Sequence, residues 1–282
     1  MMKAKKGCLL AALAMTAGAA IAAEITDHGI AAPVSNLCGV VATADRAGHD
    51  LAVALLADAS GGSGALIVDI AARKSCFVPF PDHNWNIDNR SFTSLLSTKN
   101  RYYTAFGKRF FELDLDKRAF TFSGDIEGSL GMGMCEDAQG VIYVHSYPAG
   151  NISAFDPATR QLREYGCPKK VDYGVYCRYM ACDNYGWIYC ATGTSEAEIH
   201  AFHPATGTFR QLFPIEGDPV ITAASCEVRR GPDGRVFGRT RGPRGGYYRA
   251  LSNGTVAPAE AKDWPETETP LSSLGSSERA GN

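Results

Sequence analysis

The chain has 282 residues, with 28 Lys and Arg against 30 Asp and Glu, and a formal net charge of −2. A balance without excess positive charge argues against nucleic acid as a partner, because phosphate recognition depends on clustered Lys and Arg. The length allows one large domain or two small ones, and 45% hydrophobic residues supply ample material for a core.

The first 23 residues have the pattern of a secretory signal peptide. Lys3, Lys5 and Lys6 precede an apolar run over residues 9–21, and small residues follow at 20–23. The run is too short to span a bilayer and its flanks suit cleavage after Ala22 or Ala23. We therefore predict a soluble exported protein, secreted or periplasmic, with no membrane span.

The rest of the chain repeats a unit of 40 to 50 residues five times, and two turns of that unit align independently. Spacings between successive copies of the second turn are 45, 42, 47 and 47 residues. The first turn aligns at Asp50, Asn100, Gly140, Gly186 and Gly234, and the second at Asp69, Asp114, Asp156, His203 and Ala250. Agreement of two registers over five copies indicates a repeat architecture.

Each copy divides into four short strands, which in the third copy are predicted at 132–136, 141–146, 151–155 and 161–165. β-branched and aromatic residues fill the strands, with Gly, Asp, Asn or Pro between them. Four-stranded units of this length are typical of an all-β protein, a β-propeller of about five blades. The predicted blades cover 38–79, 92–124, 131–166, 177–214 and 225–259.

We predict a propeller domain over residues 24–261 and a flexible C-terminal tail over 262–282. The tail is rich in Ser, Thr, Glu, Pro and Gly. Residues 24–30 read as a spare outer strand that would close the ring by pairing with the last blade. An incomplete or truncated ring, part of a longer propeller, is the alternative.

The blade pattern resembles that of a known group of repeat proteins. It reads Asp-x-x-Gly-x-Ile-Tyr, then Ile-x-x-Phe-Asp-Pro-Ala-Thr-Gly-x-Phe, and is strongest in the third and fourth copies. This pattern is similar to that of the NHL, SMP-30/lactonase and streptogramin-lyase-like propellers. The resemblance implies the fold, and because some members carry metal- or base-dependent sites, it keeps a divalent metal ion open as a cofactor. No motif permits the transfer of individual site residues, and no metal ligands are assigned.

Eight of the nine cysteines follow the signal peptide, and the sequence leaves two interpretations of them equally open. An even number in an exported chain permits disulfides, whose pairing the sequence does not give. Buried, unpaired cysteines acting as small apolar residues are the alternative. Zinc is less attractive, because no Cys-x-x-Cys pair occurs.

Two connections between blades are the predicted ligand-binding loops. The one at 81–90 combines an aromatic platform with planar polar groups, as sugar recognition requires. The one at 169–178 carries cations and tyrosines suited to an anionic ligand. The candidate residues are His83, Asn84, Trp85, Asn86, Asp88 and Arg90 in the first loop, and Lys169, Tyr173, Tyr176 and Arg178 in the second. Packing of the aromatic residues against neighbouring blades is the structural alternative for both.

Three further features have structural alternatives of their own. His145 ends a second strand and is the histidine to test as a catalytic base, jointly with Glu136 or His83. Seven arginines of the fifth copy could bind an acidic ligand, although a solvated basic face is the default. Gly131 and Gly133 within a strand favour a close approach of backbones.

The sequence therefore supports functions of three classes. The first is an exported propeller that binds a carbohydrate or another small polar ligand on one face of the ring. The second is a metal-dependent propeller enzyme, a lyase or lactone hydrolase. The third is a structural N-terminal part of a larger exported enzyme.

Overall fold

The computed structural model describes residues 35–36, 41–57, 63–81, 93–167, 175–193, 196–221, 225–231, 233–241 and 246–265. All of them belong to one compact unit, Val34–Asn282. The predicted signal peptide and the predicted closing strand at 24–30 lie outside the described residues. Among the described residues, no helix has the length and apolarity needed to cross a membrane.

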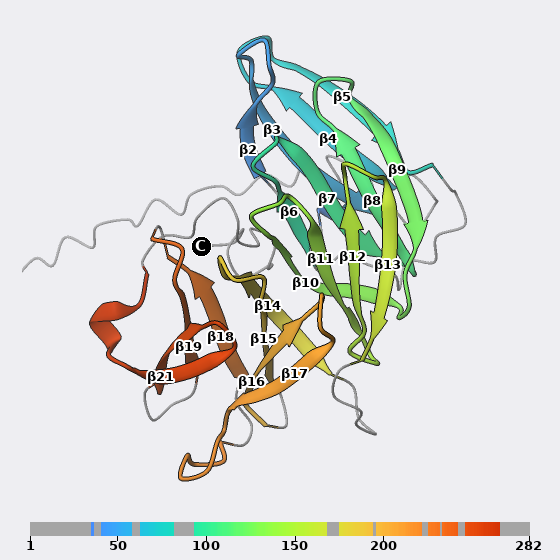
Figure 1. The fold of residues 1–282 in the computed structure, drawn as a ribbon. Helices are drawn as coiled ribbons and strands as arrows, with labels where there is room; N and C mark the ends of the chain where they lie inside the picture. Colours follow the sequence, from blue (N-terminus) through green and yellow to red (C-terminus); the bar gives the residue numbers. More distant parts are fainter. Residues whose placement is uncertain are drawn as a thin grey trace, which may run out of the picture. The chain divides into compact units, whose positions relative to one another are not determined.

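Twenty strands of the described residues form five antiparallel four-stranded units, each connected in sequence order. Figure 1 colours the units from blue to red in chain order. Blade 1 contains β2 (Val41–Ala44), β3 (Asp50–Ala57), β4 (Gly64–Asp69) and β5 (Lys74–Pro79), with the short β1 (Ser35–Asn36) also pairing with β3. Blade 2 contains β6 (Ser94–Leu96), β7 (Arg101–Phe106), β8 (Arg109–Asp114) and β9 (Ala119–Asp125). Blade 3 contains β10 (Leu130–Glu136), β11 (Ile142–Tyr147), β12 (Ile152–Asp156) and β13 (Gln161–Gly166). Blade 4 contains β14 (Tyr176–Cys182), β15 (Ile188–Gly193), β16 (Glu198–His203) and β17 (Thr208–Phe213). Blade 5 contains β18 (Ser225–Arg230), β19 (Val236–Arg241), β20 (Tyr248–Ser252) and β21 (Thr255–Ala259), and a 3-10 turn, η1 (Ala261–Asp263), follows it. The predicted fold class is confirmed.

The first hairpin of every blade closes through a residue in the left-handed backbone region. These residues are Gly48, Asn100, Gly140, Gly186 and Gly234, with φ between 57° and 86°. Glycine adopts this conformation without steric cost, and asparagine tolerates it. Four of the five positions agree with the predicted register. The alignment was wrong in blade 1, where the turn residue is Gly48 and not Asp50, which already belongs to β3.

The last hairpin of each blade, which carries the second turn of the repeat, is a four-residue turn in four blades and a two-residue turn in the fifth. In blade 3 the Asp156 carboxylate accepts hydrogen bonds from the amides of Ala158 and Thr159, and Arg160 follows with φ of 62°. In blade 5 a tight Asn253-Gly254 turn joins β20 to β21, with both residues at positive φ. The predicted turn position Ala250 is therefore wrong, because Ala250 lies inside β20 and pairs with Ala257.

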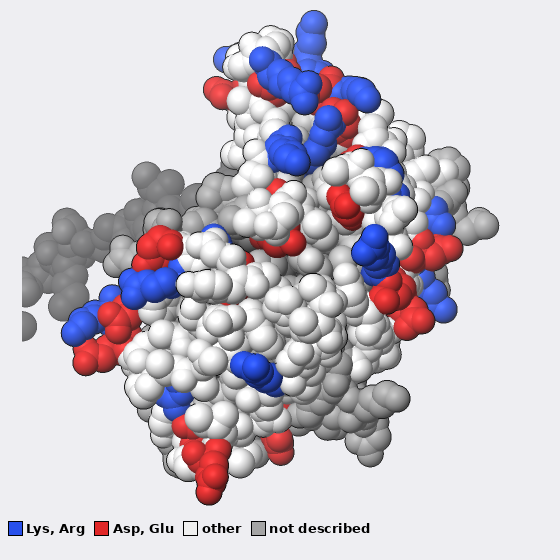
Figure 2. All heavy atoms as spheres, in the orientation of Figure 1, with Lys and Arg blue, Asp and Glu red and all other residues white. Residues whose placement is uncertain are grey.

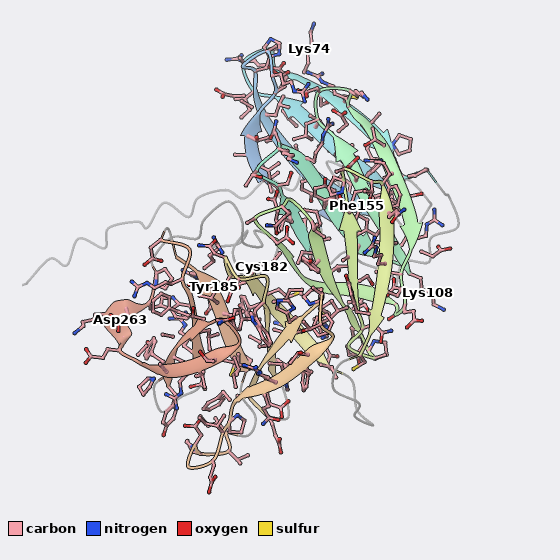
Figure 3. All side chains as sticks on the ribbon, viewed as in Figure 1. Lys74, Lys108, Phe155, Cys182, Tyr185 and Asp263 are labelled. Atoms are coloured by element: carbon pink, nitrogen blue, oxygen red, sulfur yellow. The ribbon has the colours of Figure 1, made fainter. Side chains whose placement is uncertain are left out.

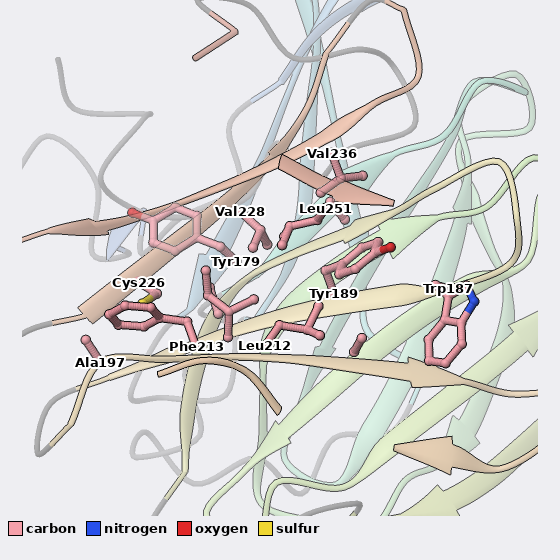
Figure 4. Packing of buried hydrophobic residues seen from close by; sticks show 14 residues of the cluster. Tyr179, Trp187, Tyr189, Ala197, Leu212, Phe213, Cys226, Val228, Val236 and Leu251 are labelled. Atoms are coloured by element: carbon pink, nitrogen blue, oxygen red, sulfur yellow. The ribbon is translucent and has the colours of Figure 1, made fainter. Parts of the chain in front are cut away.

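The core consists of four apolar layers, each between two successive blades. One layer joins blades 1 and 2, and the next joins blades 2 and 3 through Tyr103, Phe110, Met134 and Phe155. The remaining two join blades 3 and 4 and blades 4 and 5, and Figure 4 shows the last of them, which includes Tyr189 and Phe213. A blade buries its two faces only against its neighbours, so the stability of each blade depends on the next.

The glycines of β10 permit backbones of neighbouring blades to meet, as predicted. A Cβ added at Gly131 would lie 2.8 Å from the Ala105 side chain of blade 2. A Cβ added at Gly133 would lie 2.8 Å from the carbonyl oxygen of Cys177 in blade 4. β10 is therefore in backbone contact with the blades on both sides.

Three arginines of the fifth copy, Arg229, Arg230 and Arg239, have structural contacts and do not belong to the solvated basic face expected by default, whereas Arg235 is exposed and pairs with Asp233. Arg230 is buried and donates to the carbonyl of Cys182 at 2.5 Å. Arg229 and Arg239 both pair with the Glu227 carboxylate and lie over the Trp264 ring, whose centroid is 5.2 and 4.2 Å away. Trp264 therefore packs on blade 5.

Candidate functional site

Most of the predicted loop residues cannot be placed. His83, Asn84, Trp85, Asn86, Asp88, Arg90, Lys169 and Tyr173 lie outside the described residues, so their proposed roles stay predictions. Tyr176 and Arg178 are described and lie at the start of β14. The Tyr176 ring packs against Tyr147 of blade 3 at a centroid distance of 4.4 Å, and Arg178 is exposed at a bulge of the strand. The ring contact of Tyr176 is of the kind that the structural alternative expects, and its role in ligand binding stays a prediction.

Glu136 and His145 do not form the joint acid–base pair considered from the sequence. Glu136 is opposite Ile142 and His145 is opposite Gly133, which places the two side chains on opposite faces of the blade. The buried Glu136 carboxylate accepts hydrogen bonds from the amide and hydroxyl of Thr98, both at 2.8 Å. Burial raises the pKa of Glu136.

His145 is buried at the interface of blades 3 and 4, and burial, with a smaller contribution from His200, lowers its pKa to about 3. A neutral imidazole with so low a pKa is a weak base at neutral pH. His200 lies on β16 beside Glu198, with its Nε2 atom 3.1 Å from the carboxylate. No group of three or more His, Cys, Asp or Glu side chains among the described residues is arranged to hold a metal ion.

A groove of about 980 Å³ lies between blades 3 and 4, at the ends that carry their first and last hairpin turns. Its blade 3 side comes from the turn at 137–141 and from β11, β12 and β13, and its blade 4 side comes from the two turns at 184–186 and 203–205. Polar and aromatic side chains line it: Gln139, Tyr143, Asp156, Gln161, Arg163, Glu164, Tyr165, Asn184, Tyr185 and His203. Tyr185 is 61% exposed, a large solvent contact for an aromatic ring, and Figure 3 labels it in the turn between β14 and β15.

The Asp-x-x-Gly turn holds Tyr185 in place. The Asp183 carboxylate accepts hydrogen bonds from the amides of Tyr185 and Trp187 at 2.8 and 3.0 Å. Its second oxygen accepts one from the Tyr189 hydroxyl and one from the amide of Asn253 in blade 5, both at 2.8 Å. Four hydrogen bonds to one buried carboxylate fix the turn, so the exposed ring projects from a rigid support.

The groove between blades 2 and 3 is built from equivalent positions, and one ion pair crosses it. Arg160, in the last turn of blade 3, donates to the Glu112 carboxylate of blade 2 at 2.5 Å, and beside it Arg101 pairs with Asp114 within blade 2. Its volume is about 730 Å³. Glu112 also accepts hydrogen bonds from the hydroxyls of Tyr103 and Thr121. These contacts of Glu112 hold the blade 2 and blade 3 sides of the groove together.

Three charged positions of the groove between blades 2 and 3 have uncharged equivalents in the groove between blades 3 and 4. Aligned on the first and last turns of each blade, Ala154 is equivalent to Glu112, and Val141 is equivalent to Arg101. Gly207, with φ of 67°, stands where blade 3 has Arg160, and nothing lies within 4 Å of a Cβ built on it. The groove is therefore open because the side chains that cross its neighbour are missing.

The equivalent space between blades 4 and 5 is occupied by an aromatic ring. Trp187 takes the position of Val141, and its indole nitrogen donates to Asn253 at 3.1 Å. The Arg210 guanidinium lies over the same ring at 4.7 Å from the centroid. Of three successive interblade spaces, two are bridged by side chains and the middle one is left as an open groove.

Charges of both signs remain at the groove. Hydrogen bonds from the Thr159 hydroxyl and the turn amides lower the pKa of Asp156, and burial raises the pKa of Glu164. Arg163 donates to the side chain of Gln161 at 3.3 Å. The face drawn in Figure 2 likewise intermixes basic and acidic residues. The groove therefore suits a ligand that makes many neutral hydrogen bonds better than one with a high charge.

The sequence did not single out this groove, but it contained a signal. Tyr185 occupies a turn position at which exposed polar or small residues are usual. Aligning the copies also exposes the loss of Glu112 and Arg160 equivalents at Ala154 and Gly207. What the alignment lacked was the knowledge that these two positions face each other across a blade boundary.

The described chain is a β-propeller repeat protein, and comparisons with known proteins agree on the fold. No protein-family model matches the chain, and no curated protein matches its sequence. Among solved structures it is similar to a streptogramin B lyase, with 16% identity, a TM-score of 0.55, and coverage of 84% of this chain and 72% of the other. A catalytically inactive virginiamycin B lyase from Staphylococcus aureus with quinupristin gives 13% identity, a TM-score of 0.53, and coverage of 83% and 75%. The hydrazine synthase of Kuenenia stuttgartiensis gives 14%, 0.50, and coverage of 74% and 63%. At identities this low, the similarities show the β-propeller fold alone and carry no information on activity.

Proposed function

We propose that this protein is an exported β-propeller binding module whose groove between blades 3 and 4 holds a carbohydrate or another neutral polar ligand. The observation that carries the proposal is the open groove of about 980 Å³, whose equivalent between blades 2 and 3 is crossed by the Arg160–Glu112 ion pair. The export rests on the signal-peptide pattern of residues 1–23.

The chemistry of the lining favours a sugar. Sugar rings present an apolar face that packs on an aromatic side chain and hydroxyls that bond to planar polar groups. Tyr185 supplies an exposed ring, while Gln139, Gln161 and Asn184 supply amides beside it. The aspartates of the first turns support the groove rather than bind in it, because their carboxylates are occupied by turn amides and tyrosine hydroxyls.

The test restores the side chains that cross the neighbouring groove. The double variant Ala154→Glu/Gly207→Arg rebuilds the Glu112–Arg160 pair between blades 3 and 4 without changing the net charge. An arginine is tolerated at this φ, since Arg160 itself has φ of 62°. Gly207→Ala is the matched control, because it changes the same backbone position without reaching across the groove.

A thermal-shift screen of the mature protein against neutral and acidic oligosaccharides identifies a binder, and calorimetry then gives its affinity. We expect at least tenfold weaker binding for the double variant and for Tyr185→Ala, or about 1.4 kcal/mol, and wild-type affinity for Gly207→Ala. Undiminished binding by the double variant would exclude this groove as the site. Divalent cations in the same screen test the enzyme alternative, which requires saturable stabilisation by a metal ion.

A further inference from the structure

Two buried thiols from different blades lie almost within bonding distance. Cys135 is on β10 of blade 3 and Cys182 ends β14 of blade 4, and their Sγ atoms are 2.9 Å apart. Both side chains are buried, with 0% and 1% exposure. A disulfide bond measures about 2.05 Å, so a shift of less than 1 Å would join the two atoms. Figure 3 labels Cys182 among the side chains of blade 4.

The surrounding backbone already brings the two strands together. Gly133, two residues before Cys135 and on the same face of β10, leaves no room for a Cβ beside the carbonyl of Cys177 in β14. Cys135 and Cys182 share one apolar layer with Met180, Ile188 and Phe202, which fixes both thiols in place. The close approach of β10 and β14 therefore holds the two sulfur atoms 2.9 Å apart.

We propose that Cys135 and Cys182 form a disulfide that ties blade 3 to blade 4, and that it forms while the chain folds. The oxidant is a small-molecule or protein disulfide that exchanges with thiols. The thiolate of one cysteine attacks the oxidant, which forms a mixed disulfide and releases one thiol of the oxidant. The second thiolate then attacks the sulfur of the first cysteine and releases the other thiol. Two protons leave the cysteines, the cysteine pair is oxidised, and the oxidant is reduced to two thiols.

The burial of the two thiols determines at which stage of folding the disulfide can form. Only the thiolate attacks a disulfide, and burial raises the pKa of Cys135 well above its ordinary value and also raises that of Cys182. An oxidant also has no path to either sulfur once blades 3 and 4 have docked. Exchange therefore requires an open interface, after which the folded protein protects the bond.

The neighbouring thiols define the competing products. Cys177 and Cys190 lie in the same layer and hydrogen-bond to each other, but both belong to blade 4. A bond between them would leave blades 3 and 4 unconnected. The interblade pair closes a loop of 47 residues, which restricts the unfolded chain more, by about 1 kcal/mol on the loop-entropy relation.

The experiment refolds the reduced, denatured full chain in oxidised glutathione and, separately, exposes the already folded, reduced protein to the same reagent. Peptides from digestion at low pH are mapped by mass spectrometry without reduction. We expect a Cys135–Cys182 peptide, lighter by two hydrogen atoms, in the refolded sample and its absence from the sample folded before oxidation. For the loop of 47 residues, the oxidised form should have a folded-to-unfolded ratio roughly a thousandfold higher than the reduced form.

Two variants test whether the stability gained on oxidation comes from the Cys135–Cys182 bond and not from the presence of any buried thiol. Cys226→Ala removes a buried thiol of blade 5 and should keep the full gain on oxidation, while Cys135→Ala should lose it. The peptide map of the wild-type chain decides the question even if Cys135→Ala does not fold. A refolded wild-type chain linked only through Cys177 and Cys190, or not linked at all, would overturn the proposal. Equally fast oxidation of the folded protein would overturn its timing.

Discussion

Replacing Asp183 by alanine should destabilise the protein more than the same change at Asp137, although both residues hold the first turn of their blades. Asp137 accepts hydrogen bonds from the amides of Gln139 and Val141 at 2.9 Å and from the Tyr143 hydroxyl at 3.2 Å. Asp183 makes the corresponding three bonds and a fourth, from the amide of Asn253 in blade 5. The two variants therefore differ by one interblade hydrogen bond to a carboxylate.

The magnitudes follow from these contacts. A hydrogen bond to a charged group is worth roughly 1.5–3 kcal/mol, and part of that gain is offset by the cost of burying the carboxylate. We expect a loss of about 3–5 kcal/mol in the free energy of unfolding for Asp183→Ala. Asp137→Ala should cost about 1–3 kcal/mol less, the contribution of the missing Asn253 bond.

Urea denaturation at neutral pH measures both losses, and hydrogen exchange locates them. The Asn253-Gly254 turn contacts blade 4 through four groups. Besides the Asn253 amide, the Gly254 amide donates to the Tyr189 hydroxyl, the Asn253 side chain accepts from the Trp187 indole, and the Gly254 carbonyl accepts from Arg210. In Asp183→Ala the amides of β20 and β21 should exchange faster, whereas in Asp137→Ala they should keep wild-type rates. Equal losses of stability, or unchanged exchange in blade 5, would refute the view that this carboxylate joins two blades.

Two further substitutions test the interface of blades 3 and 4. Gly133→Ala places a methyl group 2.8 Å from the Cys177 carbonyl and should cost about 1–3 kcal/mol in thermal or chemical unfolding. A cost near zero would mean that the backbones do not meet there. His145→Gln should flatten the dependence of stability on pH. The pKa of His145 is lowered to about 3 in the folded protein, whereas the ordinary pKa of a histidine, expected in the unfolded chain, is about 6.5. Between these two pH values the unfolded chain therefore binds one proton that the folded protein does not. Stability from this group is complete above pH 6.5 and is lost as the pH falls toward 3, by at most about 1.4 kcal/mol per pH unit. Unfolding curves at pH 7, 6 and 5 measure the slope, and identical slopes for variant and wild type would contradict the assignment.

The strands could be predicted because their limits are set by local turn chemistry. The first strand of blade 3 was expected at 132–136 and is Leu130–Glu136, and the last was expected at 161–165 and is Gln161–Gly166. An aspartate that caps turn amides and a residue at positive φ identify each hairpin without knowledge of the rest of the fold. The errors fall where these signals drift. In blade 1 the turn glycine precedes the position chosen, and in blade 5 the four-residue turn is shortened to Asn253-Gly254.

The interblade features could not be predicted in the same way, because they depend on which residues face each other between blades. Nothing near Cys135 in the sequence indicates that Cys182 is its neighbour, since the pair is 47 residues apart and joined through a layer of side chains. Similarly, the seven arginines of the fifth copy look like a charged surface until the structure shows Glu227 and Trp264 between two of them. Strand periodicity assigns a residue to a face but not to a partner across that face.

The strongest argument for the site comes from comparing equivalent residues at successive blade boundaries. Where Glu112 and Arg160 face each other, the Tyr103 hydroxyl donates to Glu112. Where Ala154 replaces the glutamate, the equivalent Tyr143 hydroxyl donates to Asp137 instead. The interblade side chains are thus lost without leaving that hydroxyl unpaired, so the open groove is compatible with a stable fold. A repeat under structural constraint alone would be expected to keep the bridging pair or to fill the space, as Trp187 does between blades 4 and 5. The boundary between blades 3 and 4 does neither, which is why we place the ligand there.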